Sequence, residues 1–202
     1  MARPQLYSED TILDAARDLV LQGGARAATV SAIATASGAP KGSIYHRFAS
    51  LNDLLAEIWI RAVRRSQGAF LDALDDPDPI NAAVAGALSI HDFAEREPAD
   101  ARLLAALRRE DLIQRVDTAR LHHELAVLNR PLEQAMRQLA RRLYGSAKRD
   151  HIERTVCAVI DLPIGATRRH LIAGTPLPKT LRRQLEAAVR AALDVTGVSP
   201  SR

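Results

Sequence analysis

The residues best suited to chemistry lie between positions 29 and 48, in the segment TVSAIATASGAPKGSIYHRF. Thr29 predicts a helix N-cap, Gly38 the end of that helix, and Pro40 the first position of another short helix. The apolar residues that would hold both helices against a neighbouring helix are Val30, Ile33, Ala34, Ile44 and Phe48. Two short helices joined by a three-residue turn form a helix-turn-helix.

The second of these helices leaves small and hydrogen-bonding residues exposed. They are Pro40, Lys41, Gly42, Ser43, Tyr45 and His46. Gly42 and Ser43 would let the helix backbone come close to the base edges of a DNA major groove. Lys41 supplies positive charge, and Tyr45 and His46 supply hydrogen-bond donors for phosphates. The pattern therefore predicts an interface with double-stranded DNA.

From about Tyr7 to Arg65 the sequence resembles the DNA-binding domain of the TetR family of transcriptional regulators. The matching residues are Gly23-Gly24, Thr29-Val30, Ile33-Ala34 and the run from Gly38 to Phe48. The resemblance implies that residues 40–46 form the recognition helix. The DNA contacts it implies are Thr29, Pro40, Lys41, Gly42, Ser43, Tyr45 and His46. Leu51 stands where the family usually has a lysine, so one usual phosphate contact is missing.

The resemblance also implies an organisation for the whole chain. Residues 6–66 would form a three-helix DNA-binding domain, and a long helix would join it to a helical ligand-binding and dimerisation domain over residues 67–202. The function implied is that of a homodimeric repressor, released from its operator when a small-molecule effector binds. No cofactor is expected.

Two other functions are possible for a helical chain. An all-α enzyme is one, but the sequence contains no GxSxG, Walker, HExxH or CxxC motif. A helical adaptor that uses the motif for protein contacts is the other, and a gel shift with the DNA flanking the gene would separate all three.

The adjacent His122 and His123 point about 100° apart on a helix, which favours solvated side chains over metal ligands.

Apolar residues recur every three or four positions along the whole sequence, as in amphipathic helices. Ser8 and the Ser50–Asp53 pair predict N-caps for the first and fourth helices. The further predicted helical spans are residues 50–74, 80–97, 99–107, 120–143, 148–173 and 179–195, with a kink or break at Pro131. Strand-like alternation is not apparent, so the predicted fold class is all-α.

Composition excludes several classes of protein. One cysteine rules out an internal disulfide, and no apolar run approaches the roughly 20 residues of a membrane span. With no apolar signal segment near the N-terminus, these features predict a cytoplasmic protein with no membrane partner. The net charge is +4, but the first 48 residues hold five basic and four acidic residues. Bulk charge therefore does not by itself indicate a nucleic-acid partner.

The C-terminal part is expected to supply dimerisation and sensing. The helices over residues 148–173 and 179–195 carry apolar stripes, which we expect to pair with those of a second copy, with Val189 inside the interface. The helices between residues 80 and 143 are expected to form the effector pocket, with His91, Phe93, His122 and Asn129 as candidate contacts. Few aromatics occur there, which favours an apolar or weakly acidic effector over a caged cation.

Two further residues stand out in the segment TVCAVIDLPIGA. Cys157 lies on or beside an apolar stripe, so we expect a buried small side chain rather than a redox sensor. Asp161 is a carboxylate in an apolar stretch, and it predicts a charged or hydrogen-bonding partner. An arginine of the same chain or a backbone group is favoured over a ligand.

Overall fold

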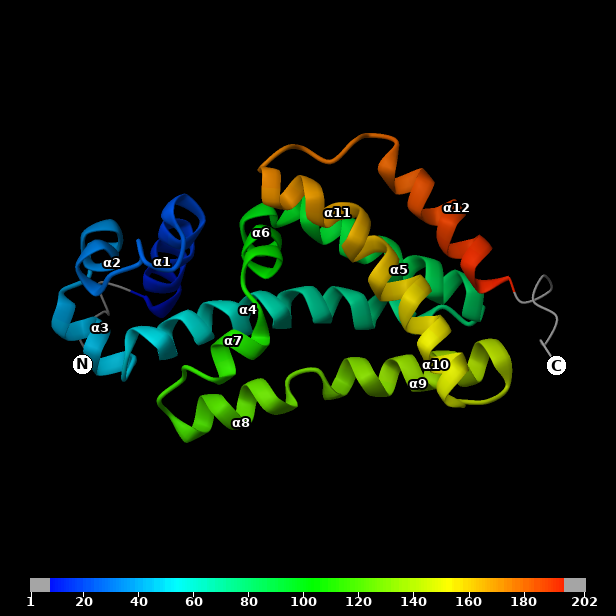
Figure 1. Ribbon diagram of the computed structural model, residues 1–202, viewed down its shortest axis with the longest axis horizontal. Helices are drawn as coiled ribbons and strands as arrows, with labels where there is room; N and C mark the ends of the chain where they lie inside the picture. The colour runs from blue at the N-terminus through cyan, green and yellow to red at the C-terminus, as the bar shows by residue number, and fades with distance from the viewer. Residues whose placement is uncertain (1–7, 195–202) are drawn as a thin grey trace, which may run out of the picture. The chain divides into compact units, whose positions relative to one another are not determined.

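The chain is all-α in the computed structural model, which describes residues 8–194 and contains no β-strand among them (Figure 1). The helices are α1 (Glu9–Gly23), α2 (Val30–Ser37), α3 (Lys41–Arg47), α4 (Leu51–Asp72), α5 (Pro79–Arg96), α6 (Pro98–Ala106), α7 (Arg109–Ile113), α8 (Ala119–Val127), α9 (Arg130–Tyr144), α10 (Arg149–Val156), α11 (Leu162–Ala173) and α12 (Leu181–Leu193). A 3₁₀ turn, η1 (Ala73–Asp75), follows α4, and a π-helical turn, η2 (Cys157–Asp161), separates α10 from α11.

The ends of α1 and α2 follow the predicted capping residues. The Ser8 hydroxyl accepts from the backbone N–H of Thr11 at 3.1 Å, and the Thr29 hydroxyl accepts from that of Ala32 at 3.1 Å. Each bond satisfies one of the backbone donors left free at a helix start. At the end of α2, Gly38 adopts a φ of +71°, a left-handed conformation that favours glycine. This residue sets the sharp turn between α2 and α3.

The long helix α4 begins with half of the predicted capping box. The Ser50 hydroxyl accepts from the backbone N–H of Asp53 at 3.1 Å. The Asp53 carboxylate is buried and accepts from the backbone N–H of Asp117 at 2.8 Å, and among the described residues no hydrogen bond from the Ser50 backbone completes the box. Asp53 therefore fixes the chain just before α8, a contact between residues far apart in the sequence.

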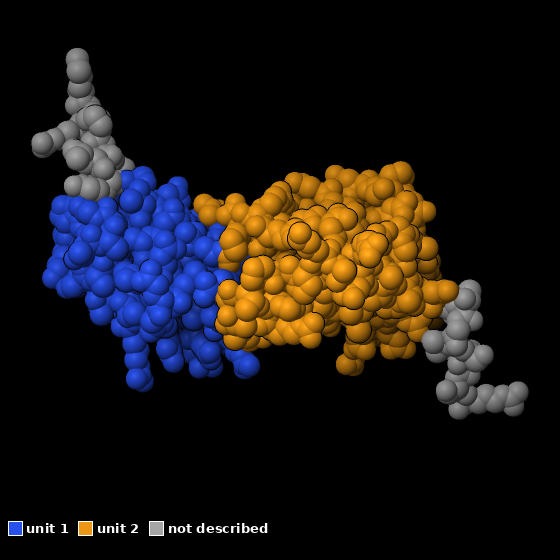
Figure 2. Space-filling model, turned by 90° about the horizontal axis from the view of Figure 1, so that it is seen from above, with its two compact units in different colours: residues 1–64, 99–128 blue, residues 65–98, 129–202 orange. Residues whose placement is uncertain are grey.

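Two compact units make up the described chain (Figure 2). Unit 1 contains residues 8–64 and 99–128, and unit 2 contains residues 65–98 and 129–194. Helix α4 contributes residues to both units. The division at about residue 66 suggested by the resemblance stays a prediction, and Tyr7 and the residues before it lie outside the described part.

Unit 1 is built on one apolar core. Ile33 of α2 and Ile44 of α3 are almost completely buried, and they pack in the same cluster as Ile12 of α1 and Ile58 of α4. Leu121 of α8 belongs to this cluster as well. The short helices α2 and α3 are thus held by tertiary packing, which helices of seven and eight residues need in water.

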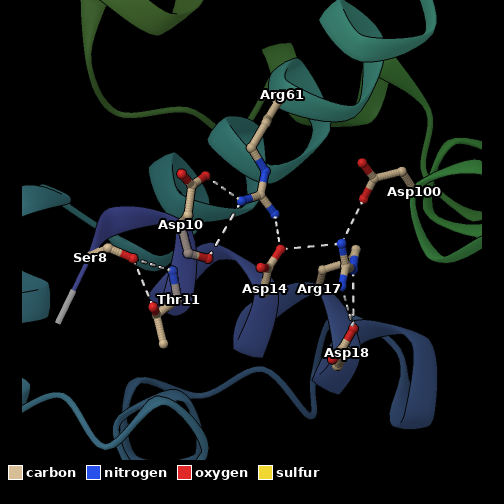
Figure 3. Close-up of polar contacts among 8 residues, drawn as sticks. All are labelled: Ser8, Asp10, Thr11, Asp14, Arg17, Asp18, Arg61 and Asp100. Carbon is tan, nitrogen blue, oxygen red and sulfur yellow. Dashed lines mark hydrogen bonds and ion pairs between the residues drawn. The ribbon is translucent and has the colours of Figure 1, made fainter. Parts of the chain in front are cut away.

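Arg17 and Arg61 add polar links within unit 1 (Figure 3). Arg61 of α4 donates to the carboxylates of Asp10 at 2.8 Å and Asp14 at 2.6 Å, both on α1. Arg17 of α1 donates to Asp100 of α6 at 2.9 Å, and Asp100 is only 1% exposed. Charge-assisted hydrogen bonds are stronger and more directional than neutral ones. They fix α1 against both α4 and α6.

Unit 2 is centred on α5, which packs against η1, α9, α11 and α12. Gly86 allows a close approach there, because a Cβ at this position would lie 2.8 Å from Leu74 Cδ2. Phe70, Met136 and Leu139 share the core of this unit. The break predicted at Pro131 is confirmed as the end of α8 and the start of α9. Within residues 8–194, no helix is both long enough and apolar enough to span a membrane.

Helix α12 turns its apolar stripe toward the core of its own unit. Leu181, Leu185 and Leu193 are buried, and Val189 has no exposed surface. The expectation that Val189 lies between two copies is therefore wrong, since its neighbours are in the same protomer. An amphipathic stripe shows that a helix face is buried, but does not show which chain buries it.

The predicted helix over residues 148–173 is interrupted by η2. Pro163 lies in the first turn of α11. A proline has no N–H for the backbone hydrogen bonds of a helix, and its ring clashes with the carbonyl group four residues earlier. A π-helical turn just before a proline accommodates that clash. Cys157 at the start of η2 is exposed, so the expectation of a buried thiol is wrong. Asp161 is also exposed and needs no internal partner.

Candidate nucleic-acid interface

Helix α3 has one buried face and one solvent-facing face. Ile44 is 1% exposed and points into the core of unit 1. Lys41, Gly42 and His46 are exposed, and Tyr45 is 60% exposed. A tyrosine this exposed contributes little to the stability of the fold, because large aromatic side chains stabilise a protein by burying most of their surface. The outward face of α3 is therefore suited to contact another molecule.

Gly42 is not required by the fold of the chain. A Cβ built at this position meets no atom within 4 Å, and its φ is not among the positive values found at the other glycines. Alanine would fit without strain and would favour the helix. Any advantage of glycine here must come from a partner that approaches the backbone closely.

The other predicted contacts lie around this face. Thr29 is exposed, with its hydroxyl used as the α2 cap, and Pro40 is exposed at the N-cap of α3. Ser43 is half-buried, and its hydroxyl accepts a hydrogen bond from Arg47 one turn later. The structure thus brings the predicted residues of α3 onto one short helix whose position is fixed by the unit 1 core.

Residues 12–58 match the family model described as bacterial regulatory proteins of the tetR family. Residues 12–58 are thus those of a TetR-type DNA-binding domain. The match covers α1, α2, α3 and the first part of α4, which are the helices that build and carry the outward face of α3. The model describes regulatory proteins, which agrees with a DNA-binding role for these helices.

Solved structures share the fold of the regulator at low sequence identity. PfmR of Thermus thermophilus, a TetR family transcriptional regulator, has a TM-score of 0.70 at 20% identity, over 90% of this chain and 96% of its own. The fatty acid degradation regulator FadR of Bacillus halodurans has a TM-score of 0.68 at 16% identity, over 95% and 100%. A TetR-family regulator of Bordetella parapertussis has a TM-score of 0.68 at 17% identity, over 95% and 97%. No curated protein matches the sequence.

Replacing Tyr45 by alanine is expected to weaken binding of the regulator to every DNA sequence by about tenfold, the loss of one hydrogen bond to a charged phosphate. Tyr45→Phe removes the hydroxyl alone and should have the same effect if that hydroxyl is the donor. Fluorescence anisotropy at moderate salt measures both affinities. Unchanged affinity in Tyr45→Ala would show that the outward face of α3 does not contact DNA.

The candidate effector contacts are spread over both units of the regulator. His91 and Phe93 of α5 are buried in unit 2. Asn129 is half-buried, and its side-chain oxygen accepts from Gln67 at 3.0 Å in the same unit. His122 is exposed on α8 in unit 1. These residues stay predictions as effector contacts.

An open groove of about 760 Å³ lies on unit 2. Val84 and Leu88 of α5 contribute apolar surface. Basic and acidic side chains contribute charge of both signs, namely those of Arg96, Arg182, Arg190, Asp76, Asp92 and Glu95. None of the four candidate effector residues lines it. The groove is lined by both apolar and charged groups, which suits a ligand of mixed character more than a purely apolar one.

One cluster in unit 2 has the residue types of a metal site. His91, Asp92 and Glu95 of α5 bring their ligand atoms within 4.8 Å of one another. The Asp92 carboxylate is bound by the guanidinium of Arg182, with Nε at 3.1 Å from Oδ1. A neighbouring positive charge opposes a bound cation, so the contacts present describe an ion-pair network between α5 and α12.

This network predicts how stability depends on pH. Burial alone would raise the pKa of Asp92. Hydrogen bonds with Arg182 and His91, together with their charges, outweigh this effect, so the pKa lies below its ordinary 3.8. A carboxyl group whose pKa is lowered by folding stabilises the fold at pH values above the pKa that it has in the unfolded chain. That contribution is lost as the pH falls through the pKa of the folded state.

Arg182→Met is therefore expected to lower the free energy of unfolding by about 1 kcal/mol or less at pH 7, as for a surface ion pair. The difference from wild type should shrink as the pH falls below 3.8. Urea titrations between pH 7 and pH 3 measure it, with Arg183→Met as the control on the same helix. A difference that stays constant with pH would show that Asp92 is not the group stabilised.

Two of these features do not follow from the sequence pattern alone. The contact of Arg47 with Ser43 has one local signal, the spacing of four residues on a helix. The pairing of Asp92 with Arg182 joins residues 90 positions apart, so no local signal could have found it.

Proposed function

We propose that the regulator is a homodimeric repressor that binds operator DNA in the cytoplasm and is released by a small-molecule effector. Residues 6–66 would bind DNA, and residues 67–202 would bind the effector and dimerise. The proposed DNA contacts are Thr29, Pro40, Lys41, Gly42, Ser43, Tyr45 and His46. The observation that carries the proposal is the outward face of α3, where an unstrained glycine with open space beside it adjoins an exposed tyrosine.

A dimer is proposed because operator recognition by a helix-turn-helix uses two half-sites about 34–36 Å apart or a multiple of that distance. A dimer is also typical of the family. Helix α11 offers an interface, since Ile164 is 45% and Ile172 is 60% exposed, among the most exposed large apolar residues of the described chain. They lie eight residues apart and so near one face of the helix. We propose that this face of α11 pairs with that of a second copy.

Effector binding is proposed for unit 2 on a separate observation. Nε2 of His91 is buried and has no hydrogen-bond partner among the described residues. Buried polar atoms are normally paired, so an unpaired one is a natural point of contact for a polar group of a ligand. We therefore keep His91, Phe93 and Asn129 of this unit as proposed contacts, with His122 of unit 1 as a separate candidate, and an apolar or weakly acidic compound as the proposed effector.

The DNA-binding part is tested by a gel shift with the DNA that flanks the gene of the regulator. A shift that resists excess unrelated DNA supports the proposal, and its absence at micromolar protein favours the adaptor function. The sensing part is tested by a ligand screen that follows both thermal stability and operator release. Coupling is reciprocal, so DNA must weaken an effector by the factor by which the effector weakens DNA. Compounds that all stabilise the protein without changing operator affinity would contradict sensing.

A further inference from the structure

A contact within α3 constrains one of the residues proposed to meet DNA. Nη1 of Arg47 donates to the hydroxyl oxygen of Ser43 and approaches the Ser43 carbonyl oxygen at 3.4 Å. The two residues are four positions apart, so their side chains lie one above the other on the helix. Both are half-buried, so the contact is partly screened from water while Ser43 keeps an exposed side.

This contact sets the direction of the Ser43 hydroxyl. A serine hydroxyl has one hydrogen to donate and two lone pairs that accept. The guanidinium occupies one lone pair through a charge-assisted bond, which is the stronger kind. Its positive charge also repels the hydroxyl hydrogen, which therefore points away from Arg47. Ser43 thus presents its hydrogen to a molecule on the outward face, with one lone pair still free to accept.

We infer that Arg47 is a positioning residue. It orients the Ser43 hydroxyl so that Ser43 selects bases by donating a hydrogen bond to an acceptor on the base edge. In the major groove, guanine N7 and O6, adenine N7 and thymine O4 accept hydrogen bonds, whereas cytosine presents only the N4 donor. Ser43 should accordingly prefer an accepting base over cytosine at the base it contacts, because donation uses the hydrogen that the Arg47 contact directs outward. The inference rests on the proposed DNA-binding function of α3 and adds to it the chemistry of one readout position.

The test is a selection from randomised DNA duplexes by the full-length protein, followed by measured affinities for the four bases at each position of the selected site. Wild type should disfavour cytosine at one position by about 2- to 10-fold, the value of one neutral hydrogen bond. Ser43→Ala should remove that discrimination at the same position. The inference is wrong if, at the position where Ser43→Ala changes the base preference, the wild-type protein binds cytosine as well as the other bases.

Variants of Arg47 separate positioning from a direct contact with DNA. Arg47→Met should relax the preference against cytosine at the Ser43 position, and adding Ser43→Ala should change nothing further. Arg47→Lys keeps an N–H donor one turn from Ser43 and should retain that preference. If Arg47→Met instead weakens binding to all sequences and reduces the salt dependence, Arg47 contacts a phosphate and the inference is wrong. Wild-type protein that selects no sequence at all would contradict the proposed function itself.

Discussion

Ile164→Arg is expected to convert the proposed dimer into a folded monomer and to lower operator affinity by about 10²- to 10⁴-fold, the gain that two linked half-sites provide. Ile164 is 45% exposed in the protomer, so an arginine there can reach water and should leave the fold intact. In the proposed dimer, the two-fold axis would place the introduced arginine inside the interface. There its charge would be buried without a partner, which is strongly unfavourable.

Light scattering and DNA-binding anisotropy on the same samples test this expectation. Ile80→Arg is a matched control, because Ile80 is 43% exposed at the start of α5 and lies outside the proposed interface. The control should remain dimeric with full operator affinity. A dimer that persists in Ile164→Arg with unchanged affinity would place the interface elsewhere.

Gly42→Ala is expected to separate stability from function. Alanine favours a helix over glycine by up to about 1 kcal/mol, and the open space at this position allows the extra methyl group, so the thermal midpoint should rise. Operator affinity should fall by about 5- to 150-fold, because the methyl group holds the helix backbone away from the base edges and costs one groove contact.

Gly68→Ala is the control for this change. Gly68 lies within α4, and a Cβ there also meets no atom within 4 Å. This variant should gain stability in the same way and keep its operator affinity. Equal affinity in Gly42→Ala and wild type would mean that no partner approaches the α3 backbone closely.

The helix-turn-helix was predictable because its signals are local. The Thr29 cap, the left-handed turn at Gly38 and the burial of Ile44 depend on neighbours within a few residues, and the structure confirms each of them. The exposure of Tyr45 follows from the same periodicity, since it adjoins the buried Ile44 on a short helix. The outward face of the candidate site could thus be found from the sequence.

The tertiary partners of the other helices were not predictable from the sequence. Asp100 is buried because Arg17, 83 positions earlier, supplies its charge partner, and a lone aspartate in a helix gives no sign of this. The stripe containing Val189 was identified, but its burial in the protomer rather than against a second copy depends on how α12 packs on α5. The exposure of Cys157 likewise follows from η2, whose extra residue per turn shifts the stripe.

Two copies of α3 are proposed to bind one operator. Hydroxyl-radical footprinting of the DNA that flanks the gene tests it most directly. We expect two protected blocks related by two-fold symmetry, with centres about 34–36 Å apart or a multiple of that distance, and much weaker protection of both blocks in Tyr45→Ala at a protein concentration near the wild-type Kd. A single unsymmetrical block, or protection that Tyr45→Ala leaves unchanged, would contradict it.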